Sequence, residues 1–190
     1  MEDTPTWNVT HGARSRVLEL RSRRGGGTVP LSGKELEAFL HEAHLAHFAT
    51  SGADGTPRVR PIWFCYADGA FWFTTRLEAR RTGADVANGS PVAVSIASDD
   101  RPYRAVIAYG RPEVWKRDTR SWLQRIATRY GEEEGKRWLA GALKEPDRVV
   151  LRLVPDKAVS WHYGKGDYTR MQKKVSLRVT LPPSSRDRSD

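Results

Sequence analysis

The spacing of apolar residues along the chain separates helical segments from extended ones. Apolar residues recur at helical spacing from Leu36 to Ala43, and Ser32 with Glu35 has the pattern of a capping box. We therefore expect a first helix at about 33–44. After it, the apolar period changes to the alternation and short continuous runs that are typical of strands.

The rest of the pattern predicts about seven strands and three further helices. The strands are expected at 45–52, 59–67, 70–76, 91–98, 103–115, 148–155 and 157–161. The helices are expected at 77–89, 118–130 and 132–144. Short Asp-Gly turns join the first three strands, so we expect an antiparallel meander with Pro61 at an edge or a bulge.

This order of elements contains few strand–helix–strand units, which argues against a parallel α/β sheet. It favours a mainly β, α+β fold: a small barrel of about six to eight antiparallel strands with a few flanking helices. We expect this domain at 31–165. Residues 1–30 have the composition of a flexible basic arm, and 166–190 form a C-terminal extension in which 175–181 alternates like a late strand.

The composition limits the cellular location and the classes of binding partner that we expect. No long apolar run and no signal-peptide pattern occurs, and Cys65 is the single cysteine, so we expect a cytoplasmic protein without membrane association. The net charge of +9 fits a nucleic-acid surface, a pocket for a phosphorylated ligand, or basic tails on an Arg-rich chain. Zinc-finger spacing, a basic heptad helix and an RNA-binding aromatic signature are missing, so we expect no nucleic-acid partner.

Residues 71–81 carry the clearest chemical signal. An aromatic strand leads to the hydroxyls of Thr74 and Thr75, and the next helix is expected to carry Arg80 and Arg81 in its first turn. A helix N-terminus attracts phosphate, and arginine and threonine side chains add hydrogen bonds to it. An exposed Arg-Arg pair on a surface helix explains the same residues, and physical chemistry alone does not separate the two interpretations.

The order of the segments resembles the pyridoxamine 5′-phosphate oxidase-like family of split β-barrels, which includes flavin and deazaflavin oxidoreductases. The resemblance extends over about 32–162 and rests on an ordered series of short motifs: RVRPIWF, FWFTT, ARR, NGSPVAV, PYRAVIAYGRPEVW and VVLRLVPDKAVSW. It implies a homodimer with FMN, or in some branches the 8-hydroxy-5-deazaflavin coenzyme, at the subunit interface.

The resemblance also assigns roles to single residues. It places the wall beside the isoalloxazine ring and the first phosphate contacts at Arg60, Pro61, Ile62 and Trp63. It places the phosphate at Thr75, Arg80 and Arg81, beside Thr74, although Ala79 replaces a frequent serine. Trp161 matches a tryptophan that lies near the ring of the partner subunit's cofactor.

One departure from the family concerns the substrate. Pyridoxamine phosphate oxidases carry an Arg-Leu-His motif shortly after that tryptophan, whereas this chain has HYGKGDYTRMQ, with Arg170 but no matching histidine. We therefore expect a small-molecule substrate other than vitamin B6, with Tyr163 and Arg170 as candidate contacts. No catalytic residue is identified, because hydride transfer is the chemistry of the cofactor.

Two classes of function remain open: an oxidoreductase, and a non-catalytic protein that stores or senses a flavin or haem. FMN alone explains the phosphate contacts, whereas the long anionic tail of the deazaflavin would use Arg58, Arg76 and Arg104. His41, His44 and His47 are spaced by three, but surface positions explain them better than a metal site. We expect no metal site, and haem ranks below the two flavin-type cofactors.

Overall fold

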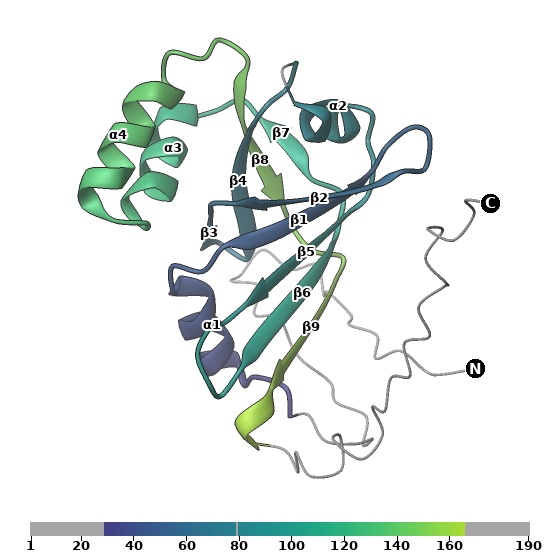
Figure 1. Cartoon of the computed structure of the whole chain (residues 1–190), viewed down its shortest axis with the longest axis vertical. Helices are drawn as coiled ribbons and strands as arrows, with labels where there is room; N and C mark the ends of the chain where they lie inside the picture. Colours follow the sequence, from purple (N-terminus) through teal and green to yellow (C-terminus); the bar gives the residue numbers. More distant parts are fainter. Residues whose placement is uncertain (1–28, 79, 166–190) are drawn as a thin grey trace, which may run out of the picture.

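Two antiparallel sheets form the centre of the computed structural model, which describes residues 29–78 and 80–165 (Figure 1). The first sheet contains, in spatial order, β2 (Pro57–Ile62), β1 (Ala46–Ser51), β5 (Val92–Ala97), β6 (Arg104–Gly110) and β9 (Lys157–His162). The second contains β3 (Phe64–Ala67), β4 (Ala70–Arg76), β8 (Arg148–Leu153) and β7 (Glu113–Trp115). The expected α+β split-barrel fold is thereby confirmed.

Two of the predicted strands each divide between the sheets. The strand expected at 59–67 breaks at Trp63, so that β2 belongs to the first sheet and β3 to the second. The strand expected at 103–115 divides in the same way into β6 and β7. The predicted three-stranded meander is wrong, because β1–β2 and β3–β4 are hairpins in different sheets. Buried apolar residues continue across the break at Trp63, which hides it in the sequence.

The main core lies between the two sheets. Phe48 of β1 and Phe73 of β4 are fully buried and meet edge to face, with ring centroids 5.0 Å apart. Helix α1 (Gly33–His41) adds Phe39 and Leu40 to this core. The predicted capping box of α1 is present, but the helix ends at His41, three residues earlier than expected.

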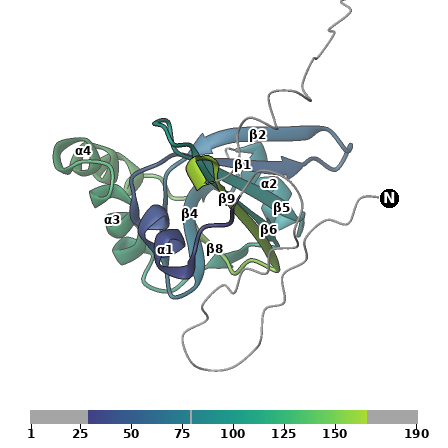
Figure 2. The same cartoon turned by 90° about the horizontal axis from the view of Figure 1, so that it is seen from below.

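Helices α3 (Thr119–Thr128) and α4 (Glu132–Ala142) lie side by side, and α3 packs against the four-stranded sheet (Figures 1 and 2). The indole of Trp122 on α3 stacks on that of Trp72 on β4, with centroids 3.5 Å apart and planes inclined by 11°. Strand β4 is therefore covered on both faces, which explains why its residues from Ala70 to Thr75 are all buried.

Helix α2 (Arg81–Ala87) is shorter than the helix expected at 77–89, and Arg80 is its N-cap. Buried Asp85 ties it to the first sheet by accepting hydrogen bonds from Thr50 Oγ1 at 2.6 Å and from an Arg58 guanidinium nitrogen at 2.7 Å. Gly83 allows α2 to approach β4 closely, because a Cβ atom at this position would lie 2.3 Å from the carbonyl oxygen of Arg76. The poor helix propensity of this glycine is thus balanced by packing.

The ends of the described chain meet at β9. The His162 N–H donates to the carbonyl oxygen of Val29 at 2.8 Å, and the short 3₁₀ helix η1 (Tyr163–Lys165) follows. The strand predicted at 175–181 lies outside the described residues. None of the helices in 29–78 and 80–165 has both the length and the apolar character that crossing a membrane requires.

We expect Gly83→Ala to lower the free energy of unfolding by about 1–3 kcal/mol, because the added methyl group overpacks the contact with Arg76. Gly141→Ala in α4 is the matched control. No atom lies within 4 Å of a Cβ placed there, so this change should raise stability by about 0.5–1 kcal/mol. Urea unfolding followed by circular dichroism measures both. Equal stability of the two variants would contradict the close approach of α2.

Candidate cofactor-binding site

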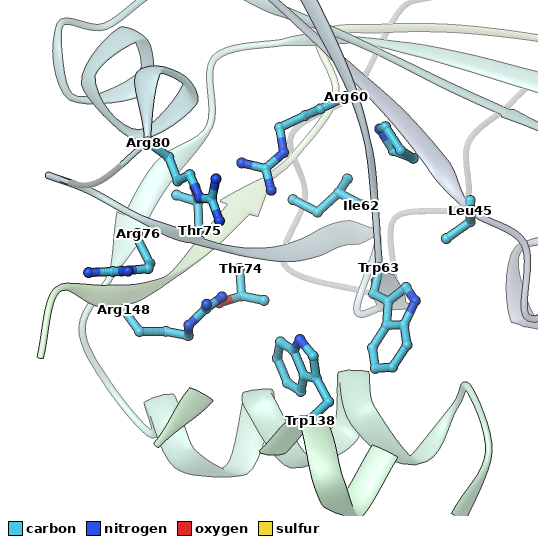
Figure 3. A pocket seen from close by; sticks show the side chains of 11 residues that line it. Leu45, Arg60, Ile62, Trp63, Thr74, Thr75, Arg76, Arg80, Trp138 and Arg148 are labelled. Carbon is cyan, nitrogen blue, oxygen red and sulfur yellow. The ribbon is translucent and has the colours of Figure 1, made fainter. Parts of the chain in front are cut away.

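A cavity of about 430 Å³ lies between β2 and the end of β4 (Figure 3). Seven of the nine residues predicted to bind the cofactor line it: Arg60, Pro61, Ile62, Trp63, Thr74, Thr75 and Arg80. The sequence did not assign Leu45, Trp138 or Arg148 to the site, and it considered Arg76 only for a long anionic tail. These four residues line the cavity as well.

Arg60 is a partly buried cation in the lining of the cavity. Burial lowers the pKa of its guanidinium, and the positive charges of Arg80 and Arg148 lower the same pKa further. Among the described residues, neither Arg60 nor Arg80 has a carboxylate partner. A partly buried cation without a counter-charge is unfavourable, so this part of the cavity attracts an anion.

Thr75 adds an unused hydrogen-bonding group to the same wall. Its side chain is only 2% exposed, and its Oγ1 has no hydrogen-bond partner among the described residues. The neighbouring Thr74 differs, because its hydroxyl donates to the carbonyl oxygen of Val149 at 2.9 Å. A buried hydroxyl without a partner costs free energy, and a ligand oxygen in the cavity would remove that cost.

The other arginines around the cavity are already neutralised. Arg76 Nε donates to Asp147 at 2.8 Å, and Arg148 forms an ion pair with Glu145. Both carboxylates come from the segment between α4 and β8. Arg60 and Arg80 therefore stand apart from these two as the cavity's cations without a described counter-charge.

Arg58, Arg76 and Arg104 were the arginines considered for the deazaflavin tail. Arg58 pairs with Asp85 at 2.7 Å, and Arg104 contacts both carboxylate oxygens of Glu42 at 2.6 and 2.8 Å. Because Arg76 is paired as well, all three have carboxylate partners within the chain. Their positive charge therefore gives no separate support for a longer anionic ligand.

Three other predicted residues lie away from the cavity lining. Arg81 begins α2; it and Arg80 are both exposed, but only Arg80 lines the cavity. Trp161 lies on β9, at the edge of the five-stranded sheet opposite β2, and its buried indole N–H has no partner among the described residues. Tyr163 contacts the Trp161 ring edge to face, at 6.3 Å between centroids. Arg170 lies outside the described residues.

The histidines considered for metal binding contact carboxylates or solvent separately. His41 contacts Glu37 at 3.2 Å, His44 contacts Glu42 at 2.8 Å, and His47 is exposed on β1. The part of the chain that the structure describes contains no group of three or more His, Cys, Asp or Glu side chains arranged for a metal ion. Cys65 is buried as predicted, and burial raises the pKa of its thiol to about 11.

Thr75→Val should raise the free energy of unfolding by about 1 kcal/mol or leave it unchanged, because it removes a buried hydroxyl that has no partner. Thr74→Val is the matched control on the same strand. It removes a hydrogen bond to Val149 and should lower stability by about 1 kcal/mol. Thermal unfolding of the protein without added cofactor measures both. A Thr75→Val variant that loses as much stability as Thr74→Val would show that the Thr75 hydroxyl has a partner.

Solved structures with the same fold come from several proteins. The conserved hypothetical protein Rv2991 from Mycobacterium tuberculosis matches with a TM-score of 0.59 and 22% identity, over 75% of this chain and 91% of that chain. An F420 reductase matches with a TM-score of 0.53 and 26% identity, over 64% and 94%. The FAD and heme binding protein from Mycobacterium smegmatis matches with a TM-score of 0.56 and 19% identity, over 83% and 95%.

The sequence itself matches a family model over most of the described domain. No curated protein matches the chain. The model that matches is that of pyridoxamine 5′-phosphate oxidase, over residues 32–162, which is more than half of the chain and includes every residue that lines the cavity. The chain therefore belongs to the pyridoxamine 5′-phosphate oxidase family.

Proposed function

We propose that the chain binds FMN in the cavity and uses it to transfer hydride to or from a small organic molecule other than vitamin B6. The observation that carries this proposal is the combination of Arg60, Arg80 and Thr75 around one space. Two cations without described counter-charges and one unpaired hydroxyl suit a phosphate group, which offers negative charge and several acceptor oxygens.

Each residue has a defined part in holding the cofactor. Arg60 and Arg80 neutralise the phosphate, and Thr75 Oγ1 donates a hydrogen bond to it. Pro61 and Ile62 offer an apolar strand surface to the ring system. When bound, the flavin supplies the hydride-transfer chemistry.

The pattern of ion pairs favours FMN over the deazaflavin coenzyme. Both cofactors contain a phosphate group, but only the deazaflavin adds a long anionic tail. The arginines that could hold such a tail, Arg58, Arg76 and Arg104, are paired with carboxylates. The likeness to an F420 reductase at 26% identity makes the deazaflavin the second cofactor to test.

A non-catalytic flavin-binding role is the alternative, and the composition of the cavity favours it. The described lining contains no histidine, carboxylate, tyrosine or cysteine, so none of its side chains is an ordinary proton donor or acceptor near neutral pH. Hydride transfer with a proton taken from water remains compatible with such a site. Turnover has to be measured separately from binding for this reason.

We also propose a homodimer in which Trp161 lies near the partner subunit's cofactor. The unpaired, buried indole N–H of Trp161 at a sheet edge supports this placement. Light scattering should give twice the mass of the chain.

Titration with FMN tests the phosphate contacts. We expect Arg60→Ala and Arg80→Ala each to raise the Kd for FMN about tenfold or more, since each loses a charge-assisted hydrogen bond. Arg120→Ala on the exposed face of α3 is the control and should leave the Kd unchanged. Arg81→Ala should have a smaller effect than Arg80→Ala, because Arg81 does not line the cavity. Wild-type affinity in both Arg60→Ala and Arg80→Ala would refute the proposed phosphate site.

Catalysis is tested by turnover of the cofactor-loaded protein. FMN with a nicotinamide reductant, or the reduced deazaflavin, is mixed with a panel of quinones and enones, and oxidation of the reductant is followed by absorbance. We expect turnover above that of free cofactor. Tight FMN binding without turnover on the panel would favour the non-catalytic alternative.

A further inference from the structure

The cavity has two chemically different ends. Figure 3 shows the guanidinium groups of Arg60 and Arg80 on one side and the indoles of Trp63 and Trp138 on the other, with Leu45 beyond Trp63. The proposed phosphate contacts use the cationic end only. The Trp63–Trp138 pair, here called the aromatic recess, has no part in those contacts.

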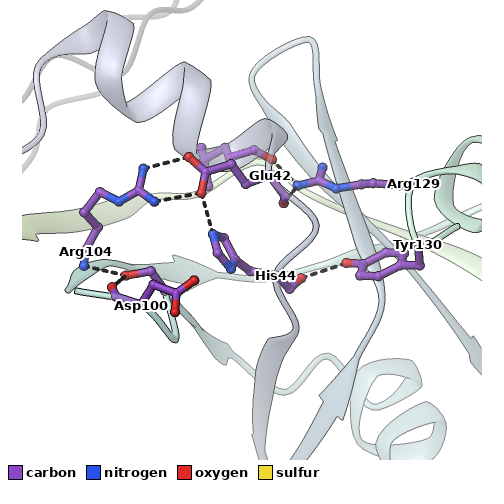
Figure 4. Close-up of polar contacts among 8 residues, drawn as sticks. Glu42, His44, Asp100, Arg104, Arg129 and Tyr130 are labelled. Atoms are coloured by element: carbon purple, nitrogen blue, oxygen red, sulfur yellow. Dashed lines mark hydrogen bonds and ion pairs between the residues drawn. The ribbon is translucent and has the colours of Figure 1, made fainter. Parts of the chain in front are cut away.

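Trp63 packs against Tyr130, which follows the C-cap of α3. Its ring stacks on Tyr130, with centroids 4.6 Å apart and planes inclined by 6°. The Tyr130 hydroxyl donates to the carbonyl oxygen of His44 at 2.8 Å, as Figure 4 shows, and it accepts the N–H of Phe64 at 3.0 Å. These bonds fix Tyr130 beside the point where the chain crosses between the sheets, so the position of Trp63 is determined before any ligand binds.

Trp138 forms the facing side of the recess from α4. Its ring lies 5.4 Å from that of Trp63 at an angle of 44°, and the guanidinium of Arg148 lies 5.5 Å from its centroid. Both indoles are only partly buried. Among the hydrogen bonds of the described residues, none is donated by the Trp63 or the Trp138 indole, and Figure 3 shows the Trp138 nitrogen on the side that faces Thr74 and the cavity.

Two inclined aromatic faces and a free N–H donor define the chemistry of a ligand. The faces favour a flat ring, and the N–H favours an acceptor oxygen or nitrogen on it. Arg60 and Arg80 in the same cavity, which have no described counter-charge, disfavour a cationic ring. We infer that the aromatic recess binds a flat, uncharged ring that carries a hydrogen-bond acceptor, and that Trp138 selects it.

This inference rests on the proposed function, since the ring belongs either to the flavin or to the molecule that exchanges hydride with it. Three probes separate the possibilities. Riboflavin has the flavin ring without phosphate, inorganic phosphate has no ring, and menadione is a flat, uncharged quinone. Equilibrium dialysis against the full-length chain gives the Kd of each, with menadione measured on the FMN-loaded protein as well.

Trp138→Ala should raise the Kd of a ring probe about three- to tenfold, and Trp138→Phe should fall between it and the wild type, because the aromatic face remains and the N–H is lost. The Kd for phosphate should not change. Trp115→Phe on β7, outside the cavity lining, is the control for loss of an indole. Circular dichroism checks that each variant is folded.

A loss confined to riboflavin assigns the recess to the cofactor ring, and a loss confined to menadione assigns it to the substrate. Unchanged affinity for both rings in folded Trp138→Ala overturns the inference, as does a wild-type chain that binds neither ring. A wrong phosphate site would be detected by a different measurement, the FMN titration, as an unchanged Kd in the Arg60→Ala and Arg80→Ala variants. The two proposals therefore fail through different measurements.

Discussion

Partial burial of one guanidinium group beside two others is the constraint around which this site is arranged. Burial lowers the pKa of the Arg60 guanidinium most, and the positive charges of Arg80 and Arg148 lower it further. The fold relieves part of the repulsion between the guanidinium groups of the cavity with Glu145, which pairs with Arg148, and with Asp147, which pairs with Arg76. It supplies no described carboxylate to Arg60 or Arg80. The uncompensated charge is therefore localised at one end of the cavity, where it is most favourable for an anion to bind.

The two sheets place this charge opposite a hydrogen-bond donor. Arg60 belongs to β2, which pairs with β1 at the edge of the first sheet, whereas Thr75 belongs to β4, which lies between β3 and β8 in the second. The chain crosses between these sheets at Trp63, so the cavity forms at the crossing. Because β4 is packed on both faces and α2 is tied down through Asp85, the walls of the cavity are set by the core rather than by loops.

Local patterns predicted the parts of this arrangement that depend on neighbours in sequence. The capping box at Ser32 and the Asp-Gly turns mark elements because their hydrogen bonds close within a few residues. The start of α2 was misplaced because Arg80 makes no side-chain cap, and the sequence therefore has no marker there. With α2 beginning at Arg81, Arg80 lines the cavity and Arg81 does not, although both are exposed.

The residues that sequence analysis missed reach the site through long-range packing. Trp138 lies on the same helical pattern as Leu139 and Ala142, so nothing local distinguishes a wall of the cavity from an ordinary helix face. Arg148 resembles any basic residue at the start of a strand until Glu145 and Thr74 are placed beside it. A free indole N–H, or a hydroxyl without a partner as in Thr75, becomes visible only when its surroundings are known.

The cationic end of the cavity, with Arg60 and Arg80, is separate from the aromatic end, so the residues at one end can change in evolution while those at the other stay the same. In the proposed complex with FMN, the contacts to the phosphate would lie away from the atoms that exchange hydride, so they would contribute binding energy without restricting which molecule reacts. Selectivity must then come from the other end, where this chain has Trp63 and Trp138. This chain lacks the Arg-Leu-His motif, but it keeps Arg60, Thr75 and Arg80 in the cavity lining. On this proposal a family member can lose the contacts to one substrate while the residues proposed to hold the cofactor's phosphate remain, because the two groups of residues contact different ligand atoms.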